Sequence, residues 1–366
     1  MKVLVTGSSG FIGQHLVRAL KRKGHEVLLF DRENTGAELL KDIEEADAIC
    51  HLAGENRPKD LADFEKVNHG LTETICSAIR ASKKQKRLLF ASSIQADLNN
   101  PYGVSKKEAE VCIEKLAKET NTLCSIFRLP NVFGKGCRPF YNSVVATWCY
   151  QIARGEQTTI SNPSNELHLV YVCDVADAFV NSLDESKPSL WPLVSPIYDT
   201  TLGELNKLIH ECADSRKTRE IPVQEGLSKK MYATYISYIP EDAISYEIKV
   251  AREPRGSFNE IIRLKNMGQV SINVIAPHKI KGGHYHETKI EKFVFLTGHC
   301  VYRMYPVGKP DQVASKEILC DGDNYIVIDV TPGYFHKIEN IGQTDAITLI
   351  WASEEYTDLV PDTYRE

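Results

Sequence analysis

The sequence lacks several features that would place it in other classes of protein. No stretch approaches the roughly 18 consecutive apolar residues of a membrane-spanning helix. Lys and Arg number 44 against 49 Asp and Glu, so no excess of charge favours nucleic acid or an anionic membrane as a partner. Ten scattered cysteines form no Cys-x-x-Cys pair, and the first residues do not resemble a secretory signal. We therefore expect a cytoplasmic protein with reduced thiols.

A glycine-rich turn lies between a predicted strand and a predicted helix at the start of the chain. The apolar residues 2–5 precede it, and Leu16 and Leu20 follow at helical spacing. Within the turn, Gly7 would permit a positive φ, Gly10 a close approach to a pyrophosphate, and Gly13 tight packing of helix on strand. The N–H groups at the helix start would face the phosphates. The pattern predicts a dinucleotide site.

Two adjacent residues at the end of the second predicted strand favour different nicotinamide cofactors. Asp31 would bond a ribose 2′-hydroxyl and favour NAD. Arg32 would instead meet a 2′-phosphate and favour NADP. The residues alone leave both open.

A serine, a tyrosine and a lysine form a predicted catalytic set. Ser93 ends an apolar strand, and Tyr102 and Lys106 lie one turn apart on the helix that follows. A nearby ammonium is expected to lower the pKa of the phenol, so that Tyr102 can exchange a proton with a carbinol oxygen that Ser93 also bonds. His51, inside a buried strand, is interpreted as a core histidine rather than a catalytic one.

These features resemble the extended short-chain dehydrogenases/reductases that act on nucleotide sugars. Further matches are residues 128–136 and 171–176. The resemblance implies a Rossmann-like doubly wound parallel sheet over residues 1–245 and a UDP-sugar substrate. Strand and helix patterns that alternate up to about residue 180 agree with it. Pattern and resemblance together assign to the cofactor Gly7, Ser9, Gly10, Phe11, Ile12, Gly13, Asp31, Arg32, Leu52, Ala53, Lys106 and Leu129.

From residue 246 the sequence changes to short β runs separated by Gly, Pro and Asn, which predicts an all-β jelly roll over residues 246–366. In a strand, His284 and His286 would point to one face, Glu291 would return on the next strand, and His336 would follow a tight turn. Three imidazoles and a carboxylate suit a divalent metal.

The same residues resemble both sequence motifs of the cupins. His-x-His is followed by Glu291 and Gly298, and Pro-Gly by His336 and Asn340. The chain departs from the family at two points: His278 stands where cupins carry Gly, and Pro332 directly precedes Gly333 in the sequence. Residues 281–285 also resemble the metal-free deoxysugar 3,5-epimerases, in which the equivalent of His284 is the base. We favour the metal, most simply zinc.

A reductase fused to such a cupin resembles the bifunctional enzymes of capsular polysaccharide synthesis. This resemblance implies a homodimer that epimerises C3 of a UDP-4-keto-6-deoxy-N-acetylhexosamine. It then reduces C4 with NADPH, with NADH as the alternative, to give UDP-N-acetyl-6-deoxy-L-talosamine. Three other interpretations remain: a 4-ketoreductase with a structural or dimerising cupin, a sugar dehydratase or 4-epimerase, and a non-enzymatic sensor of NAD(P)H.

Overall fold

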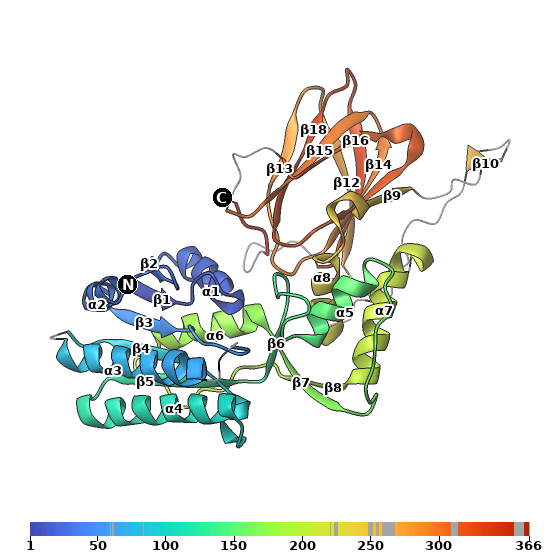
Figure 1. The fold of residues 1–366 in the computed structure, drawn as a ribbon. Coiled ribbons are helices and arrows are strands. Elements are labelled where there is room, and N and C mark those ends of the chain that lie inside the picture. Colours follow the sequence, from blue (N-terminus) through green and yellow to red (C-terminus); the bar gives the residue numbers. More distant parts are fainter. Residues whose placement is uncertain are drawn as a thin grey trace. The chain divides into compact units, whose positions relative to one another are not determined.

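The computed structural model describes residues 1–58, 60, 62–82, 84–219, 221–222, 226–247, 252–253, 256–257, 268–308, 314–354 and 362–365. The chain divides into two units (Figure 1). The first contains Met1–Phe133 and Glu166–Thr200, and the second contains Gly134–Asn165 and Thr201–Glu366. The predicted boundary at residue 245 coincides with the start of strand β9 (Ser245–Glu247), but two earlier segments also group with the second unit.

The first unit is built on a parallel sheet in the order β2-β1-β3-β4-β5. Its strands are β1 (Lys2–Thr6), β2 (Glu26–Phe30), β3 (Ala48–His51), β4 (Arg87–Ser93) and β5 (Leu123–Leu129). The strand order reverses between β1 and β3, and ligands of such sheets bind at the carboxyl ends of the strands beside this reversal. The predicted Rossmann-like sheet is confirmed.

Helices cover both faces of this sheet (Figure 1). Side chains of α1 (Phe11–Arg22) and α6 (Val172–Asp184) share a core with Val3 and Val5. Side chains of α2 (Gly36–Glu45), α3 (Leu71–Ala81) and α4 (Pro101–Thr120) share the opposite core with Leu4. Successive residues of β1 are therefore buried in two different cores, which explains why all of them are apolar between Val3 and Val5.

Shorter elements complete the first unit. Residues of a π-helix, η1 (Phe64–Gly70), lead into α3, and a 3₁₀ turn, η2 (Ile94–Asp97), follows β4. A separate small sheet contains β6 (Asn131–Phe133), β7 (Glu166–Tyr171) and β8 (Tyr198–Thr201). The side chain of Asn100 caps α4 by accepting from Gly103 N at 2.8 Å, and Pro101 begins the helix, which fixes where the predicted catalytic helix starts.

The second unit contains two antiparallel sheets, in the orders β12-β19-β14-β17-β9 and β13-β18-β15-β16. Their inner faces meet, since the ring of Phe293 lies 6.3 Å from that of Tyr302. The predicted all-β region is confirmed. Its strands are β12 (Gln269–Ile275), β13 (Ile280–His284), β14 (Glu291–Thr297), β15 (His299–Pro306), β16 (Lys316–Asp321), β17 (Ile326–Val330), β18 (Tyr334–Asn340) and β19 (Ala346–Ala352), with the turns η3 (Glu241–Ala243) and η4 (Gly322–Asn324) and the small pair β10 (Arg252–Glu253) and β11 (Gly256–Ser257).

Three helices also belong to this unit, namely α5 (Val144–Ile152), α7 (Leu202–Thr218) and α8 (Leu227–Ile236). Buried charges attach α7 to the sandwich. Asp329 on β17 is paired with Lys292 and, at 3.2 Å, with Arg216 of α7. These pairs explain why residues before the predicted boundary group with the β-strands. Among the described residues, no helix combines the length and the apolarity that a membrane crossing requires.

Candidate functional site

The glycine-rich turn brings the ends of β1 and β3 together. Gly7 has a φ of +69°, and a Cβ there would lie 2.8 Å from Ala53 N. A Cβ on Gly13 would lie 2.0 Å from the carbonyl oxygen of Gly7. Both positions therefore require glycine. Leu52 and Ala53 continue from β3 beside this turn, with Leu52 N donating to Thr6 O at 3.1 Å.

The first turn of α1 has no side-chain cap. Gly10 is its N-cap residue, and Phe11 and Ile12 open the helix. An uncapped start leaves backbone N–H groups and the positive end of the helix dipole for an anionic ligand. This is the arrangement predicted for a pyrophosphate.

The two residues that favour different cofactors are both already bonded. Asp31 accepts from the hydroxyl of Ser8 at 2.5 Å and from the backbone and side chain of Ser9. Burial alone would raise the pKa of Asp31, but these hydrogen bonds lower it, so its carboxylate supports the turn. The guanidinium of Arg32 lies 2.6 Å from Glu55, yet its side chain is 82% exposed. Because solvent surrounds the guanidinium side of this pair, it is screened and contributes little to stability.

The predicted catalytic residues lie at the end of β4 and the start of α4. Burial raises the pKa of Tyr102, and a hydrogen bond with Ser93 acts in the opposite direction. This net direction is opposite to the lowering that Lys106 was expected to cause, because desolvation of the phenol dominates. Leu129 pairs in register with Ser93 on the neighbouring strand.

Lys106 is almost fully buried, at 4% exposure. Its ammonium donates to Ala91 O at 3.0 Å and lies 4.8 Å from the centre of the Phe90 ring. Burial lowers the pKa of Lys106 to about 8, although Glu110 acts to raise it. The ammonium is therefore charged at neutral pH and loses its proton within a range that an assay can reach.

A buried carboxylate one turn beyond Lys106 was not predicted from the sequence. Glu110 accepts from Ser92 at 2.7 Å and from two guanidinium nitrogens of Arg128, at 2.8 and 2.6 Å. Arg128 also donates to Asp97 at 2.9 Å. The network ties α4 to β4 and β5 beneath Ser93. The spacing of four residues from Lys106 is the one signal that could have indicated Glu110.

His51 has the structural role predicted for it. The ring is fully buried, and its two nitrogens lie 2.7 Å from the hydroxyl of Thr6 and 3.0 Å from that of Thr72. Burial lowers the pKa of His51 to about 3, so it stays neutral in the core.

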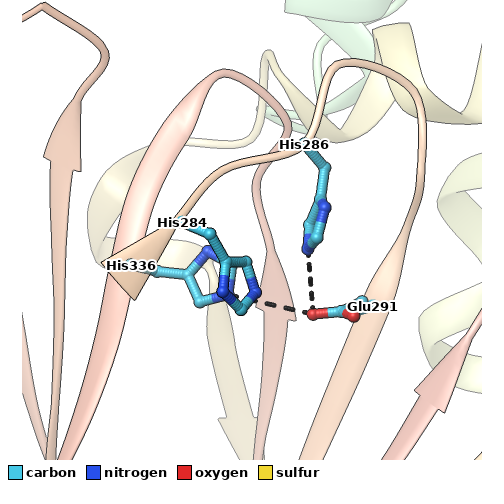
Figure 2. Close-up of side chains that lie close together, drawn as sticks. All are labelled: His284, His286, Glu291 and His336. Carbon is cyan, nitrogen blue, oxygen red and sulfur yellow. Dashed lines mark ion pairs between the residues drawn. The ribbon is translucent and has the colours of Figure 1, made fainter. Parts of the chain in front are cut away.

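The four predicted metal ligands converge in the second unit (Figure 2). One candidate ligand atom from each of His284, His286, Glu291 and His336 lies within 4.8 Å of all the others. His284 and His336 are opposite one another on β13 and β18, while Glu291 begins β14 in the other sheet. His286 lies beyond the end of β13, so alternation along one strand does not place it beside His284. The loop after β13 brings His286 to the cluster.

The electrostatics of this cluster fit a cation. Glu291 Oε2 is 3.1 Å from His286 Nε2 and 3.8 Å from His336 Nε2 (Figure 2). Burial alone would raise the pKa of Glu291, but its contact with His286 and the charges nearby lower it to about 2. Burial lowers the pKa of His284 to about 4 and that of His336 to about 3, so both rings are neutral and keep a lone pair. Within the described part of the chain, neither ring nitrogen of His336 has a hydrogen-bond partner.

The two departures from the cupin pattern leave this geometry intact. Pro332 and Gly333 form the turn between β17 and β18, where Gly333 has a φ of +81°. His278, which replaces a glycine, adopts the positive φ of +58° that glycine would favour. Asn340 is buried, and its side-chain amide donates to Ile275 O at 2.8 Å and Thr344 O at 2.9 Å. We assign Asn340 a structural role in the turn before β19.

Three contacts near the cluster were not predicted from the sequence. Lys289 lies 3.4 Å from Glu291, and the buried Lys135 pairs with Glu287. Asp362 accepts hydrogen bonds from three successive backbone N–H groups of the loop that carries His286. No local pattern could indicate Asp362, because its partners lie more than seventy residues earlier, with a separation of 75 for Glu287.

Comparison with known proteins gives two family matches along the chain. Residues 3–190 match the NAD dependent epimerase/dehydratase family. Residues 251–364 match the polysaccharide biosynthesis C-terminal domain.

Two of the relatives match this chain over its whole length, and a third matches its first region. The chain is 39% identical to UDP-2-acetamido-2,6-beta-L-arabino-hexul-4-ose reductase of Pseudomonas aeruginosa, over 100% of this chain and 98% of the relative. It resembles the crystal structure of the capsular polysaccharide assembling protein CapF of Staphylococcus aureus, with 35% identity and a TM-score of 0.66, over 100% of this chain and 99% of that one. UDP-glucose 4-epimerase of Thermus thermophilus shares the fold of the first region, with 24% identity and a TM-score of 0.52 over 58% of this chain and 83% of that one.

Proposed function

The chain belongs to the NAD dependent epimerase/dehydratase family, and from that premise we propose that it is a bifunctional nucleotide-sugar enzyme of polysaccharide synthesis. The all-β region epimerises C3 of a UDP-4-keto-6-deoxy-N-acetylhexosamine. The Rossmann-like region then reduces the C4 ketone with NADPH to give UDP-N-acetyl-6-deoxy-L-talosamine. The observation that carries the proposal is the cluster of Glu291 with the buried His286 and His336 and the half-buried His284, in a chain that also has Ser93, Tyr102 and Lys106.

For reduction, the residues at the end of β4 handle the proton. A bound nicotinamide would supply the hydride. Ser93 would bond the C4 oxygen, and Tyr102 would give it a proton as the carbonyl becomes a carbinol. The raised pKa of Tyr102 keeps the phenol protonated and ready to donate. The Lys106 ammonium, directed by Ala91 O, would stabilise the phenolate that remains.

For epimerisation, the interior of the sandwich fits a metal through its donor set. His284, His286, Glu291 and His336 would hold it, with zinc the simplest choice. A divalent ion there would act as a Lewis acid toward negative charge on the substrate. Among the described residues, the ring nitrogens of His336 have no hydrogen-bond partner, and this supports the assignment because a buried imidazole without a hydrogen bond is costly. As a ligand, His284 would not be the base.

The chemistry dictates the order of the two steps. The C3 proton is acidic only while C4 is a ketone, since the carbanion delocalises into that carbonyl. Reduction removes the carbonyl and with it the acidity of C3. Epimerisation must therefore come first.

The finer assignments are part of the same proposal. NADPH is favoured over NADH because the exposed guanidinium of Arg32 can leave Glu55 for a 2′-phosphate. We also propose a cytoplasmic homodimer, which light scattering after gel filtration would test.

The decisive experiment follows solvent deuterium into the UDP-4-keto sugar by NMR, with no nicotinamide added, before and after a chelator. We expect uptake at C3 that the chelator abolishes. If the C4 ketone is reduced once NADPH is supplied but C3 takes up no deuterium, the enzyme is a 4-ketoreductase with a structural β-sandwich. Uptake that survives the chelator would assign the proton transfer to an imidazole alone.

A further inference from the structure

We propose that Asp362 is a positioning residue for the candidate metal centre, because it shapes the loop of residues 285–289 and fixes the orientation of His286. This inference rests on the metal-binding role proposed above. We place Asp362 in contact with neither the substrate nor the metal, because it acts through His286.

The carboxylate of Asp362 is enclosed by donors from the loop. Oδ1 accepts from Glu287 N at 2.8 Å, and Oδ2 accepts from Thr288 N at 2.7 Å and Lys289 N at 2.5 Å. The hydroxyl of Thr288 also donates to Oδ2, at 2.8 Å. Three successive backbone N–H groups that converge on one anion form a concave site of the kind that binds anions in many proteins. Here a side chain of the same chain fills it and so defines the path of the loop.

The backbone carbonyl of Asp362 fixes the orientation of the His286 ring. Asp362 O lies 2.6 Å from His286 Nδ1. A carbonyl oxygen can only accept, so Nδ1 carries a proton and Nε2 is left as the nitrogen available to a metal ion. Nε2 is the atom that faces Glu291 inside the cluster, at 3.1 Å. Partners of this kind orient metal-binding histidines and increase their affinity for the ion.

Neighbours of Asp362 extend the same contact. Tyr364 and Tyr285 exchange two backbone hydrogen bonds, of 2.9 and 3.0 Å. Thr363 accepts from the ammonium of Lys289 at 2.9 Å, and that ammonium lies 3.4 Å from Glu291. Residues 362–364 thus run along the loop between two predicted ligands. The site reaches its full geometry only when this segment is docked.

The first test measures zinc affinity by competition with a chromophoric chelator, in the full-length protein. In Asp362→Asn, an NH₂ group replaces one acceptor oxygen and faces donors, so the loop loses part of its support. We expect zinc to bind about 10- to 100-fold more weakly. Asp345→Asn, at an exposed aspartate of the same sandwich, is the matched control and should bind zinc as the unchanged protein does. Equal affinity in Asp362→Asn would overturn the proposal.

A second test needs no metal and separates this inference from the proposed function. In the metal-free protein, ¹⁵N chemical shifts of His286 should report a protonated Nδ1, and the amides of residues 287–289 should exchange slowly with solvent. In a variant that ends after residue 361 the Nδ1 signal should shift, and Asp362→Asn should show faster exchange of those amides. If zinc fails to bind the unchanged protein while these signals change as expected, the metal assignment is wrong, and Asp362 supports the loop of residues 285–289 without serving a metal centre. Signals that stay the same in both variants would refute the role of Asp362.

Discussion

The two candidate sites differ in how their buried polar groups are satisfied. At the end of β4, Glu110 has partners in Ser92 and Arg128, and Lys106 donates to a carbonyl. In the β-sandwich, His336 is equally buried, yet its ring nitrogens have no hydrogen-bond partner among the described residues. At the first site, the buried charges of Glu110 and Lys106 are thus met by groups of the protein itself. The second has the donors of a cation site and a free energy cost that a bound cation would remove.

Substitution of Tyr102 should give the largest difference between the two sites, because it removes reduction at C4 and leaves proton exchange at C3. In Tyr102→Phe, the proton donor for the C4 oxygen is lost, and we expect kcat for reduction to fall about 10²- to 10⁴-fold. Deuterium uptake at C3 should be unchanged, and this second assay on the same variant serves as the control. A parallel loss of both activities would mean that the two sites are not independent.

The reciprocal variant is His336→Ala. Loss of one of four ligands should weaken zinc binding by more than about 100-fold, since even partners outside the first shell contribute 10- to 100-fold. Deuterium uptake at C3 should disappear, while Tyr102-dependent reduction of a C3-epimerised ketone persists. His299→Ala, at an exposed histidine of the same sandwich, is the control. Normal C3 exchange in His336→Ala would leave the cluster a structural role only.

Removal of the Glu110 carboxylate should show how much the ion pair with Arg128 contributes to the stability of the protein. Glu110→Gln leaves Arg128 with Asp97 as its one anionic partner among the described residues, and breaking such a buried pair costs about 3 kcal/mol. We expect a lower free energy of unfolding in urea denaturation. Glu114→Gln, farther along α4, should change it by less than about 0.5 kcal/mol. If the two variants unfold alike, the network contributes little to stability.

The pH dependence should distinguish the sites by a smaller effect. Burial lowers the pKa of Lys106 to about 8, so the charged form is lost as the pH rises through that value. The kcat/KM for reduction should therefore fall about tenfold per pH unit above it. Lys106→Arg should remove this limb, because a guanidinium keeps its proton. A limb that remains near pH 8 in Lys106→Arg would belong to another group.

Much of both sites could be predicted because local geometry fixes them. The glycine spacing of residues 7–13 and the four-residue step from Tyr102 to Lys106 are properties of one turn and one helix. The four candidate metal ligands follow a family pattern, but strand alternation does not account for the pair of His284 and His286, since His286 lies in the loop after β13. The pKa values at the sites were less predictable. The pKa of Tyr102 depends on desolvation, which cannot be inferred from the spacing of residues in the sequence.

Short-range causes account for the glycine-rich turn, the capped helix α4 and the continuous apolar run that makes β1 a strand buried on both faces. Tertiary structure alone decided that Glu110 pairs with Arg128, that α7 attaches to the sandwich through Asp329, and that Asp362 supports the loop of His286. Periodicity describes which face of an element is buried, and it carries no information about which distant donor will meet a buried acceptor. That pairing is fixed only when the chain has folded and each buried charge must find a partner.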